Sequence, residues 1–194
     1  MEKIDFKQIT EQLKSHGMTS FGEPFSLHVP NAMQALWSAM EYFIGRNLVW
    51  LPEYAQVAAW LENSCGRGLC LYGTNGTGKT VLVQKVIPAL LFGYCRKVVK
   101  CVNYYDLNPQ ADSIINCRLL SIDDAGLENE CVAYGNKHWV FPEIMDIAEK
   151  RNHIVIFSSN LDAQGFCDKY GIRTLERIVA TTKRIEFNHQ SLRK

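Results

Sequence analysis

The chain has 194 residues, of which 47% are hydrophobic and 21% are charged, and its formal net charge is +1. These values are typical of one globular domain that can bury a core, and they exclude a protein held to nucleic acid by bulk charge alone. Seven cysteines without a Cys-x-x-Cys pair indicate neither a disulfide framework nor a zinc site. Neither a signal peptide nor an apolar run long enough to span a bilayer is evident, so we expect a cytoplasmic protein with no membrane contact.

Residues 1–48 predict a helical N-terminal extension ahead of a larger domain at residues 49–194. A first helix is indicated by apolar residues at helical spacing and a glycine suited to end it, namely Phe6, Ile9, Leu13 and Gly17. A second helix, capped by Asn31, has an apolar face of Met33, Leu36, Trp37, Met40 and Phe43. These helices either pack on the core of the larger domain or dock a partner.

The larger domain alternates apolar runs with helical segments. Pro52 is expected to begin a helix that ends near Gly66, and Pro88 to kink or end the helix that follows the glycine-rich segment at residues 73–80. Buried strands are predicted at residues 68–72, 98–102, 118–124 and 154–157, and further helices at residues 140–151 and 171–178. This alternation predicts an α/β fold, with a parallel sheet between helices.

The segment Gly73–Thr80 matches G-x-x-x-x-G-K-[ST], the P-loop that binds nucleotide phosphates. Glycines let the backbone turn so that its N–H groups point at the anion, and the positive end of the following helix adds a favourable field. Lys79 is expected to reach the β- and γ-phosphates, and the hydroxyl of Thr80 to bind Mg²⁺. The residues expected to surround the nucleotide are Gly73, Thr74, Asn75, Gly76, Thr77, Gly78, Lys79, Thr80 and Val81.

Polar side chains at two later strand ends complete a candidate site for ATP and Mg²⁺. Asp123 closes the third predicted strand and is expected to hold Mg²⁺, while Asp124 is expected to orient or deprotonate the attacking water. Asn160 follows the fourth strand, where a small polar side chain can contact the γ-phosphate or the water.

Two arginines lie four residues apart on one face of the helix predicted at residues 171–178. An exposed arginine is usually solvated or paired with a carboxylate. In a nucleotide hydrolase, however, such a group can stabilise transition-state charge on the γ-phosphate as an arginine finger. Arg177 and Arg173 are therefore further candidates for catalysis.

The order and spacing of these motifs resemble the DnaC-type helicase-loader branch of the AAA+ ATPases, together with the related IstB-type transposition helpers. The resemblance covers roughly residues 50–194, and besides the P-loop its matching segments are 66–69, 122–128, 134–136, 159–161, 170–177 and 191–193. It implies an AAA+-like P-loop NTPase that hydrolyses ATP to ADP and phosphate. It further implies a homo-oligomer with ATP between subunits, and a replicative DNA helicase as partner in DNA replication.

Read through the resemblance, Asn160 corresponds to the sensor 1 residue and Arg177 to the arginine finger, with Arg173 as second candidate. The chain also departs from the family. Asp124 stands where many AAA+ proteins have glutamate, so slow hydrolysis is expected. The connector at residues 106–117 is short, which leaves contact with single-stranded DNA open. The chain ends soon after residue 193, so no C-terminal lid domain is expected, and no sensor 2 arginine is evident.

Three alternatives remain beside an ATP-dependent helicase loader. A transposition helper like IstB would need firm, salt-sensitive binding to duplex DNA. A slowly hydrolysing, ATP-bound adaptor would suit the shorter Asp124. A small-molecule kinase would need a lid arginine that acts within its own chain, and the C-terminal arginines fit that role poorly.

Overall fold

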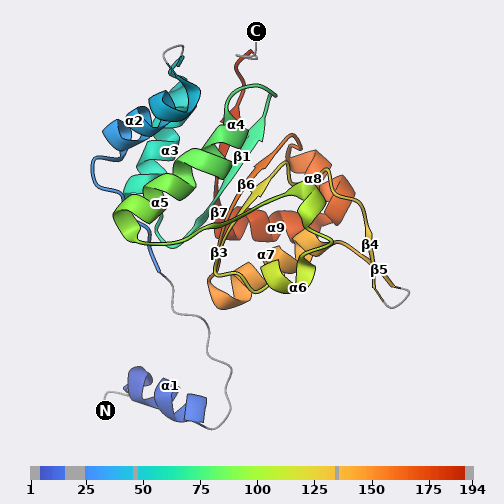
Figure 1. The fold of residues 1–194 in the computed structure, drawn as a ribbon. Coiled ribbons are helices and arrows are strands. Elements are labelled where there is room, and N and C mark those ends of the chain that lie inside the picture. The colour runs from blue at the N-terminus through green and yellow to red at the C-terminus, as the bar shows by residue number, and fades with distance from the viewer. Residues whose placement is uncertain (1–4, 16–24, 46–47, 134–135, 191–194) are drawn as a thin grey trace.

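The computed structural model describes residues 5–15, 25–45, 48–133 and 136–190, and its centre is a five-stranded parallel sheet (Figure 1). The strand order is β2–β3–β6–β1–β7, and every pairing is parallel. The strands are β1 (Gly68–Gly73), β2 (Lys100–Asn103), β3 (Leu119–Asp123), β6 (Ile154–Ser159) and β7 (Thr182–Phe187). The predicted α/β fold is confirmed, and β7 is a strand that the sequence reading missed.

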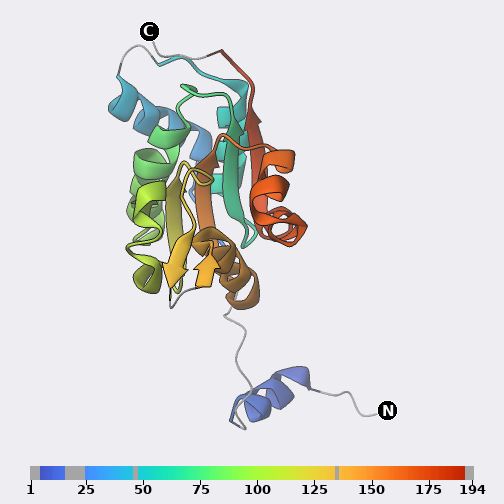
Figure 2. The same cartoon turned by 90° about the vertical axis from the view of Figure 1, so that its right-hand side faces the viewer.

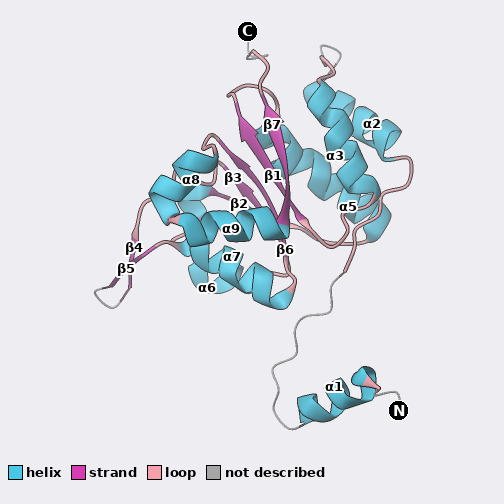
Figure 3. Ribbon diagram, turned by 180° about the vertical axis from the view of Figure 1, so that it is seen from behind, coloured by secondary structure: helices cyan, strands magenta, loops and turns pink. Residues whose placement is uncertain are grey.

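Helices cover both faces of this sheet (Figures 2 and 3). One layer contains α2 (Ala32–Ile44), α3 (Pro52–Glu62), α4 (Lys79–Val81), η1 (Leu82–Val86) and α5 (Ile87–Cys95). The other contains α7 (Val140–Arg151), α8 (Ala163–Tyr170) and α9 (Ile172–Thr181). The shorter elements are α1 (Phe6–Ser15), η2 (Tyr104–Asp106), α6 (Ala111–Ile114), and the antiparallel pair β4 (Cys131–Ala133) and β5 (Asn136–His138). Within the described ranges no helix has the length and apolar character needed to cross a membrane.

Alternation along the strands divides the apolar core into two clusters. In β1, Leu69 and Leu71 pack with the α2–α3–α5 layer, whereas Cys70 packs with the α7–α9 layer. Successive strand side chains point to opposite faces, so a strand buried on both sides reads as one continuous apolar run. This is why β1, β3 and β6 could be recognised from sequence.

Helix α2 packs on the core of the larger domain, which was one of the two alternatives for this segment. Its buried face differs from the predicted one: Leu36 and Met40 are buried as expected, but Met33 and Trp37 are exposed. Alanines fill the rest of the interface, with Ala32 among the buried residues. These small side chains let α2 approach its neighbours closely, and the larger apolar residues Met33 and Trp37 lie on its exposed face.

The predictions for the two N-terminal helices have different outcomes: the capping role of Asn31 is wrong, and the role of Gly17 at the end of α1 stays a prediction. Asn31 directly precedes α2, but its backbone is left-handed (φ 51°) and its side chain makes no capping hydrogen bond. In α1, the described side chains of Ile9 and Leu13 are exposed. Gly17 lies outside the described residues, as do residues 134–135 of the matching segment 134–136 and the whole of the segment 191–193.

Pro88 does not end the helix after the P-loop, because α5 continues to Cys95. The turn before it is instead a π-turn, η1, from Leu82 to Val86. Proline lacks an N–H and its ring crowds the carbonyl four residues earlier, and a wider turn relieves both problems. The expected distortion is therefore present, without a break in the helix.

Candidate nucleotide-binding site

The P-loop connects the carboxyl end of β1 to the start of α4, as its motif requires. Gly73 and Gly78 have φ values of 109° and 90°, which only glycine adopts readily. A Cβ on Gly73 would lie 2.5 Å from the backbone oxygen of Phe187, and one on Gly78 would lie 2.9 Å from the Tyr54 hydroxyl. Both glycines are thus needed for conformation and for space.

Neighbouring elements hold the loop in shape. The backbone N–H of Thr74 donates to the carbonyl of Phe187 at the end of β7 (2.8 Å). From α3, the buried Tyr54 hydroxyl donates to the Thr77 carbonyl (2.9 Å). Burial, with the nearby charge of Glu53, raises the pKa of Tyr54 to about 12, so its hydroxyl keeps its proton at neutral pH.

Lys79 lies inside the curve of the loop. Its side chain is buried, and its ammonium group donates to the carbonyls of Gly73 (2.8 Å) and Thr74 (2.7 Å). Thr80, the next residue, is exposed. A cation held among backbone groups at a helix start is an arrangement suited to phosphate.

Ser158 links the two aspartates at the end of β3. Its hydroxyl donates to Oδ1 of the buried Asp123 (2.5 Å) and accepts the backbone N–H of Asp124 (2.9 Å). Asp124 itself is partly buried and left-handed (φ 56°), a conformation that aspartate tolerates better than most residues. Sequence reasoning missed Ser158 as a positioning residue, although its place near the end of β6 could have suggested the role.

Asn160 is exposed at the same edge of the sheet, directly after β6. Its position depends on the preceding serine: Ser159 Oγ donates to the carbonyl of Ala125 (2.6 Å) and accepts the N–H of Leu161 (3.1 Å). These bonds attach the turn that carries Asn160 to the loop after Asp123. The parallel sheet therefore brings the P-loop, Asp123 and Asn160 to one edge, as predicted.

A second network fixes the loop that follows Asp124. Buried Glu128 accepts hydrogen bonds from the N–H of Gly126 (2.8 Å) and from the Tyr170 hydroxyl on α8. The ammonium of Lys169 donates to the carbonyls of Gly126 and Glu128, both at 2.7 Å, and lies over the ring of Trp139. Burial and the negative charge of Glu128 raise the pKa of Tyr170, so it remains a donor. Sequence reasoning did not find this network, because its members are far apart along the chain.

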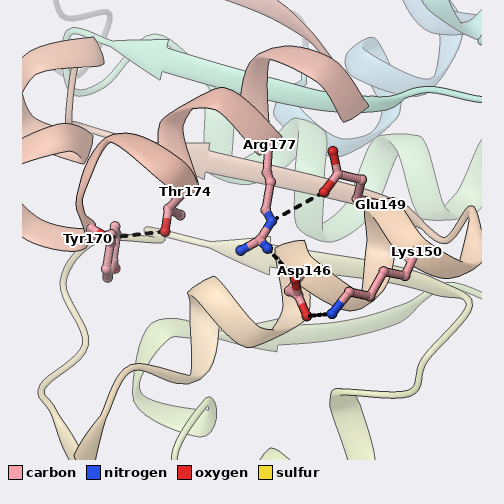
Figure 4. Close-up of polar contacts among 6 residues, drawn as sticks. All are labelled: Asp146, Glu149, Lys150, Tyr170, Thr174 and Arg177. Atoms are coloured by element: carbon pink, nitrogen blue, oxygen red, sulfur yellow. Dashed lines mark hydrogen bonds and ion pairs between the residues drawn. The ribbon is translucent and has the colours of Figure 1, made fainter.

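The two candidate finger arginines have different surroundings on α9, and Figure 4 shows those of Arg177. Arg177 is 12% exposed at its side chain and pairs with Asp146 and with Glu149 (3.2 Å), both on α7. Arg173, one turn earlier, is exposed. Among the described residues, the side-chain ion pairs of Arg177 go to α7 of its own chain and not to the P-loop.

The carboxylate of Asp146 is the centre of this cluster. It also accepts a hydrogen bond from Lys150 (2.6 Å), on its own helix. That hydrogen bond and the positive charges of Arg177 and Arg173 hold the pKa of Asp146 below its ordinary value. The cluster joins α7 to α9 on the face of the sheet opposite α2 and α3.

No protein-family model and no curated protein sequence matches the chain. Solved structures do. A structure of DnaI is 26% identical, with a TM-score of 0.53, over 66% of this chain and 73% of its own. A DnaC helicase loader is 14% identical, with a TM-score of 0.60, over 79% and 98%. AMPPCP-bound DnaA from Aquifex aeolicus is 17% identical, with a TM-score of 0.51, over 73% and 48%.

At these identities the similarity concerns the fold. The sheet with its flanking helices matches that of the AAA+ P-loop NTPases, and the P-loop, Asp123 and Asn160 lie at the carboxyl ends of its strands, where open α/β sheets bind ligands. The resemblance to the DnaC-like branch is confirmed at this level. The chain has the AAA+ P-loop NTPase fold, which it shares with the solved structures of DnaI, the DnaC helicase loader and DnaA.

Proposed function

We propose that this chain is an ATP-dependent assembly switch in DNA replication, which binds ATP, hydrolyses it to ADP and phosphate, and acts on a replicative helicase. The observation that carries the proposal is the buried Lys79 ammonium inside a P-loop that shares its sheet edge with the Asp123–Ser158 pair. The helicase is proposed because one structural neighbour is named as a helicase loader.

Each residue of the site has a proposed role. The backbone of residues 73–81 and the Lys79 ammonium hold the phosphates, and Thr80 with Asp123 holds Mg²⁺, which offsets charge on the phosphate oxygens. Asp124 orients the attacking water, and Asn160 contacts the water or the γ-phosphate. Ser158 is a positioning residue, because it acts through Asp123 and Asp124.

A second copy of the chain completes the site. We assign the arginine finger to Arg177 or Arg173 of the neighbouring subunit, since each lies on α9. Arg173 is exposed and can reach a neighbour directly, whereas Arg177 must first leave Asp146 and Glu149. If Arg177 exchanged its carboxylate partners on α7 for the nucleotide of the neighbouring subunit, subunit contact would be coupled to nucleotide state. Within the extension at residues 1–48, the proposed docking segment for the helicase is α1, which exposes Ile9 and Leu13, because α2 packs on the core of the larger domain.

One observation favours a slowly hydrolysing adaptor as second candidate. Asp124 has a shorter side chain than glutamate, and its left-handed backbone is held by Ser158. A carboxylate that reaches the water poorly would leave ATP bound for long periods. Tight ATP retention with no measurable turnover would favour the adaptor over the hydrolysing switch.

The test is ATPase activity per subunit across a wide range of protein concentrations, followed by subunit mixing. Activity that rises with concentration is expected if a neighbour completes the site. Lys79→Ala should abolish ATP binding, while the finger variant should keep ATP affinity and lose turnover by about a thousandfold. Arg177→Ala and Arg173→Ala are compared to identify that variant.

Mixing then separates a shared site from a site complete within one chain. A Lys79→Ala subunit still offers its arginines, and a finger-variant subunit still offers its P-loop, so the mixture should regain activity that neither variant has alone. Failure of every mixture to regain activity, together with wild-type activity that is independent of concentration, would refute the shared site.

A further inference from the structure

A positively charged cleft lies at the edge of the sheet opposite the P-loop. Parallel strands have all their amino ends at one edge, and here β2 pairs with β3 so that Lys100 lies opposite Leu120. The segments that lead into these two strands are therefore adjacent. These two segments and the strand starts, together with Phe25 from the segment before α2, form the cleft. Its lining residues are Phe25, Lys97, Val98, Lys100, Cys117, Arg118 and Leu119.

Three of these seven lining residues are cations, and none of the seven is acidic. The whole chain has a net charge of only +1, so the excess of positive charge in the cleft is local and does not follow from the overall composition. No ion pair found among the described residues includes Lys97 or Lys100. Lys100 donates to the hydroxyl of Ser113 (2.8 Å), which is a neutral partner.

An aromatic ring lies among these cations. The guanidinium of Arg118 is 4.7 Å from the centre of the Phe25 ring, and the ammonium of Lys97 is 5.9 Å from it. A guanidinium that lies over an aromatic ring forms with it a platform on which a planar base can stack. The exposed apolar side chain of Val98 lies beside it.

Positive charge continues beyond the cleft toward the end of α7. Arg151, the last residue of α7, donates to the side-chain oxygen of Asn116 (2.7 Å). Burial, and then the charges of Arg151 and Arg118, hold the pKa of His153 below its ordinary value. Cationic side chains therefore extend over a surface wider than the cleft itself.

We propose that this cleft binds single-stranded nucleic acid, with backbone phosphates at Lys97 and Lys100 and a base stacked on the Phe25–Arg118 platform. Cations along a groove with an aromatic stacking surface are the combination that single strands require, because their bases are free to stack. A duplex hides its bases, and an acidic peptide would gain nothing from the ring. The site is separate from the P-loop and does not depend on ATP hydrolysis.

The test is fluorescence anisotropy of a labelled single-stranded oligothymidylate at several salt concentrations, with the full chain. Lys97→Ala/Lys100→Ala should lower affinity, and should reduce the slope of log K against log salt by about 1.4, or about 0.7 for each phosphate that is no longer neutralised. Phe25→Leu should lower affinity by about tenfold without changing that slope. The matched control is Lys183→Ala/Arg184→Ala, which removes two exposed cations from β7 at the other side of the sheet and should change neither quantity.

Binding of a fluorescent ATP analogue must stay unchanged in every variant, which shows that each has folded and that the P-loop is intact. The proposal is overturned if the wild-type chain does not bind the oligonucleotide, or if the control double variant loses as much affinity as the cleft variant. Equal affinity for duplex DNA or for polyglutamate would also overturn it, because charge alone would then explain binding.

Discussion

Arg177→Met removes the charge that joins α9 to α7 while it keeps most of the apolar stem. The pair with Glu149 contributes little, since that carboxylate is 47% exposed and screened. The pair with Asp146 is worth more, because the two side chains are only 12% and 24% exposed. A hydrogen bond between charged groups contributes about 1.5–3 kcal/mol, so the free energy of unfolding should fall by about 2 kcal/mol.

The assay is urea denaturation at neutral pH, supported by thermal unfolding. For a chain of this size, a loss of about 2 kcal/mol corresponds to a decrease in Tm of about 4–8 °C. Arg173→Met is the matched control, because it removes an exposed arginine from the same helix, and it should change stability by no more than about 0.5 kcal/mol. A double-mutant cycle of Arg177→Met with Asp146→Asn should give a coupling of about 1 kcal/mol or more.

Acid pH provides a second check on the same contact. The pKa of Asp146 is lowered in the folded chain from its ordinary value of 3.8, first by Lys150 and then by Arg177 and Arg173. Its stabilising effect is therefore complete above pH 3.8 and is lost as the pH falls through the lower, folded-state pKa. The stability difference between wild type and Arg177→Met should shrink over that range. A coupling below about 0.5 kcal/mol, or equal losses in the two arginine variants, would refute the reasoning.

The remaining predictions concern the nucleotide edge of the sheet. Ser158→Ala should cost about 2 kcal/mol in urea denaturation and weaken Mg-ATP binding in calorimetry, because buried Asp123 loses a donor; unchanged Mg²⁺ dependence would count against its positioning role. Tyr54→Phe should lower the free energy of unfolding by about 1 kcal/mol and weaken ATP binding, because the Thr77 carbonyl loses its hydrogen-bond donor. An unchanged ATP affinity would show that this hydrogen bond does not keep the P-loop in its binding conformation. Wild-type stability should fall between pH 10 and about 12 as the unfolded chain ionises Tyr54 first, and the fall should be smaller in Tyr54→Phe, in which Tyr170 with its raised pKa still contributes.

Much of the fold could be predicted because its signals are local. The helix expected at residues 140–151 coincides with α7, and the strands expected at residues 68–72 and 154–157 lie within β1 and β6. In contrast, β7 has buried Thr182, Ile185 and Phe187 separated by exposed charged residues, so it has no continuous apolar run. Its place is set by pairing with β1, which is tertiary information.

In the candidate site, too, the local motifs could be predicted and the tertiary contacts could not. Gly73 to Thr80, Asp123 and Asn160 could be placed together, because motifs and strand ends converge in a parallel sheet. The Glu128–Tyr170 bond joins residues 42 positions apart, and the Ser158–Asp123 bond joins residues 35 positions apart. No local pattern encodes such pairs. The outward position of Trp37 on α2 likewise depends on a tertiary contact, since its ring centre lies 5.2 Å from that of Trp50, in the segment before α3.

The bond between Thr74 and Phe187 has a practical consequence for handling this protein. The last strand ends where the P-loop begins, and the two are joined backbone to backbone at 2.8 Å. A tag, surface tether or fluorescent fusion placed after residue 190 would therefore exert its force within a few residues of the phosphate cradle. Attachment at that end can report on nucleotide binding, whereas assays that need an undisturbed site call for a label elsewhere, such as on exposed Tyr94 at the end of α5.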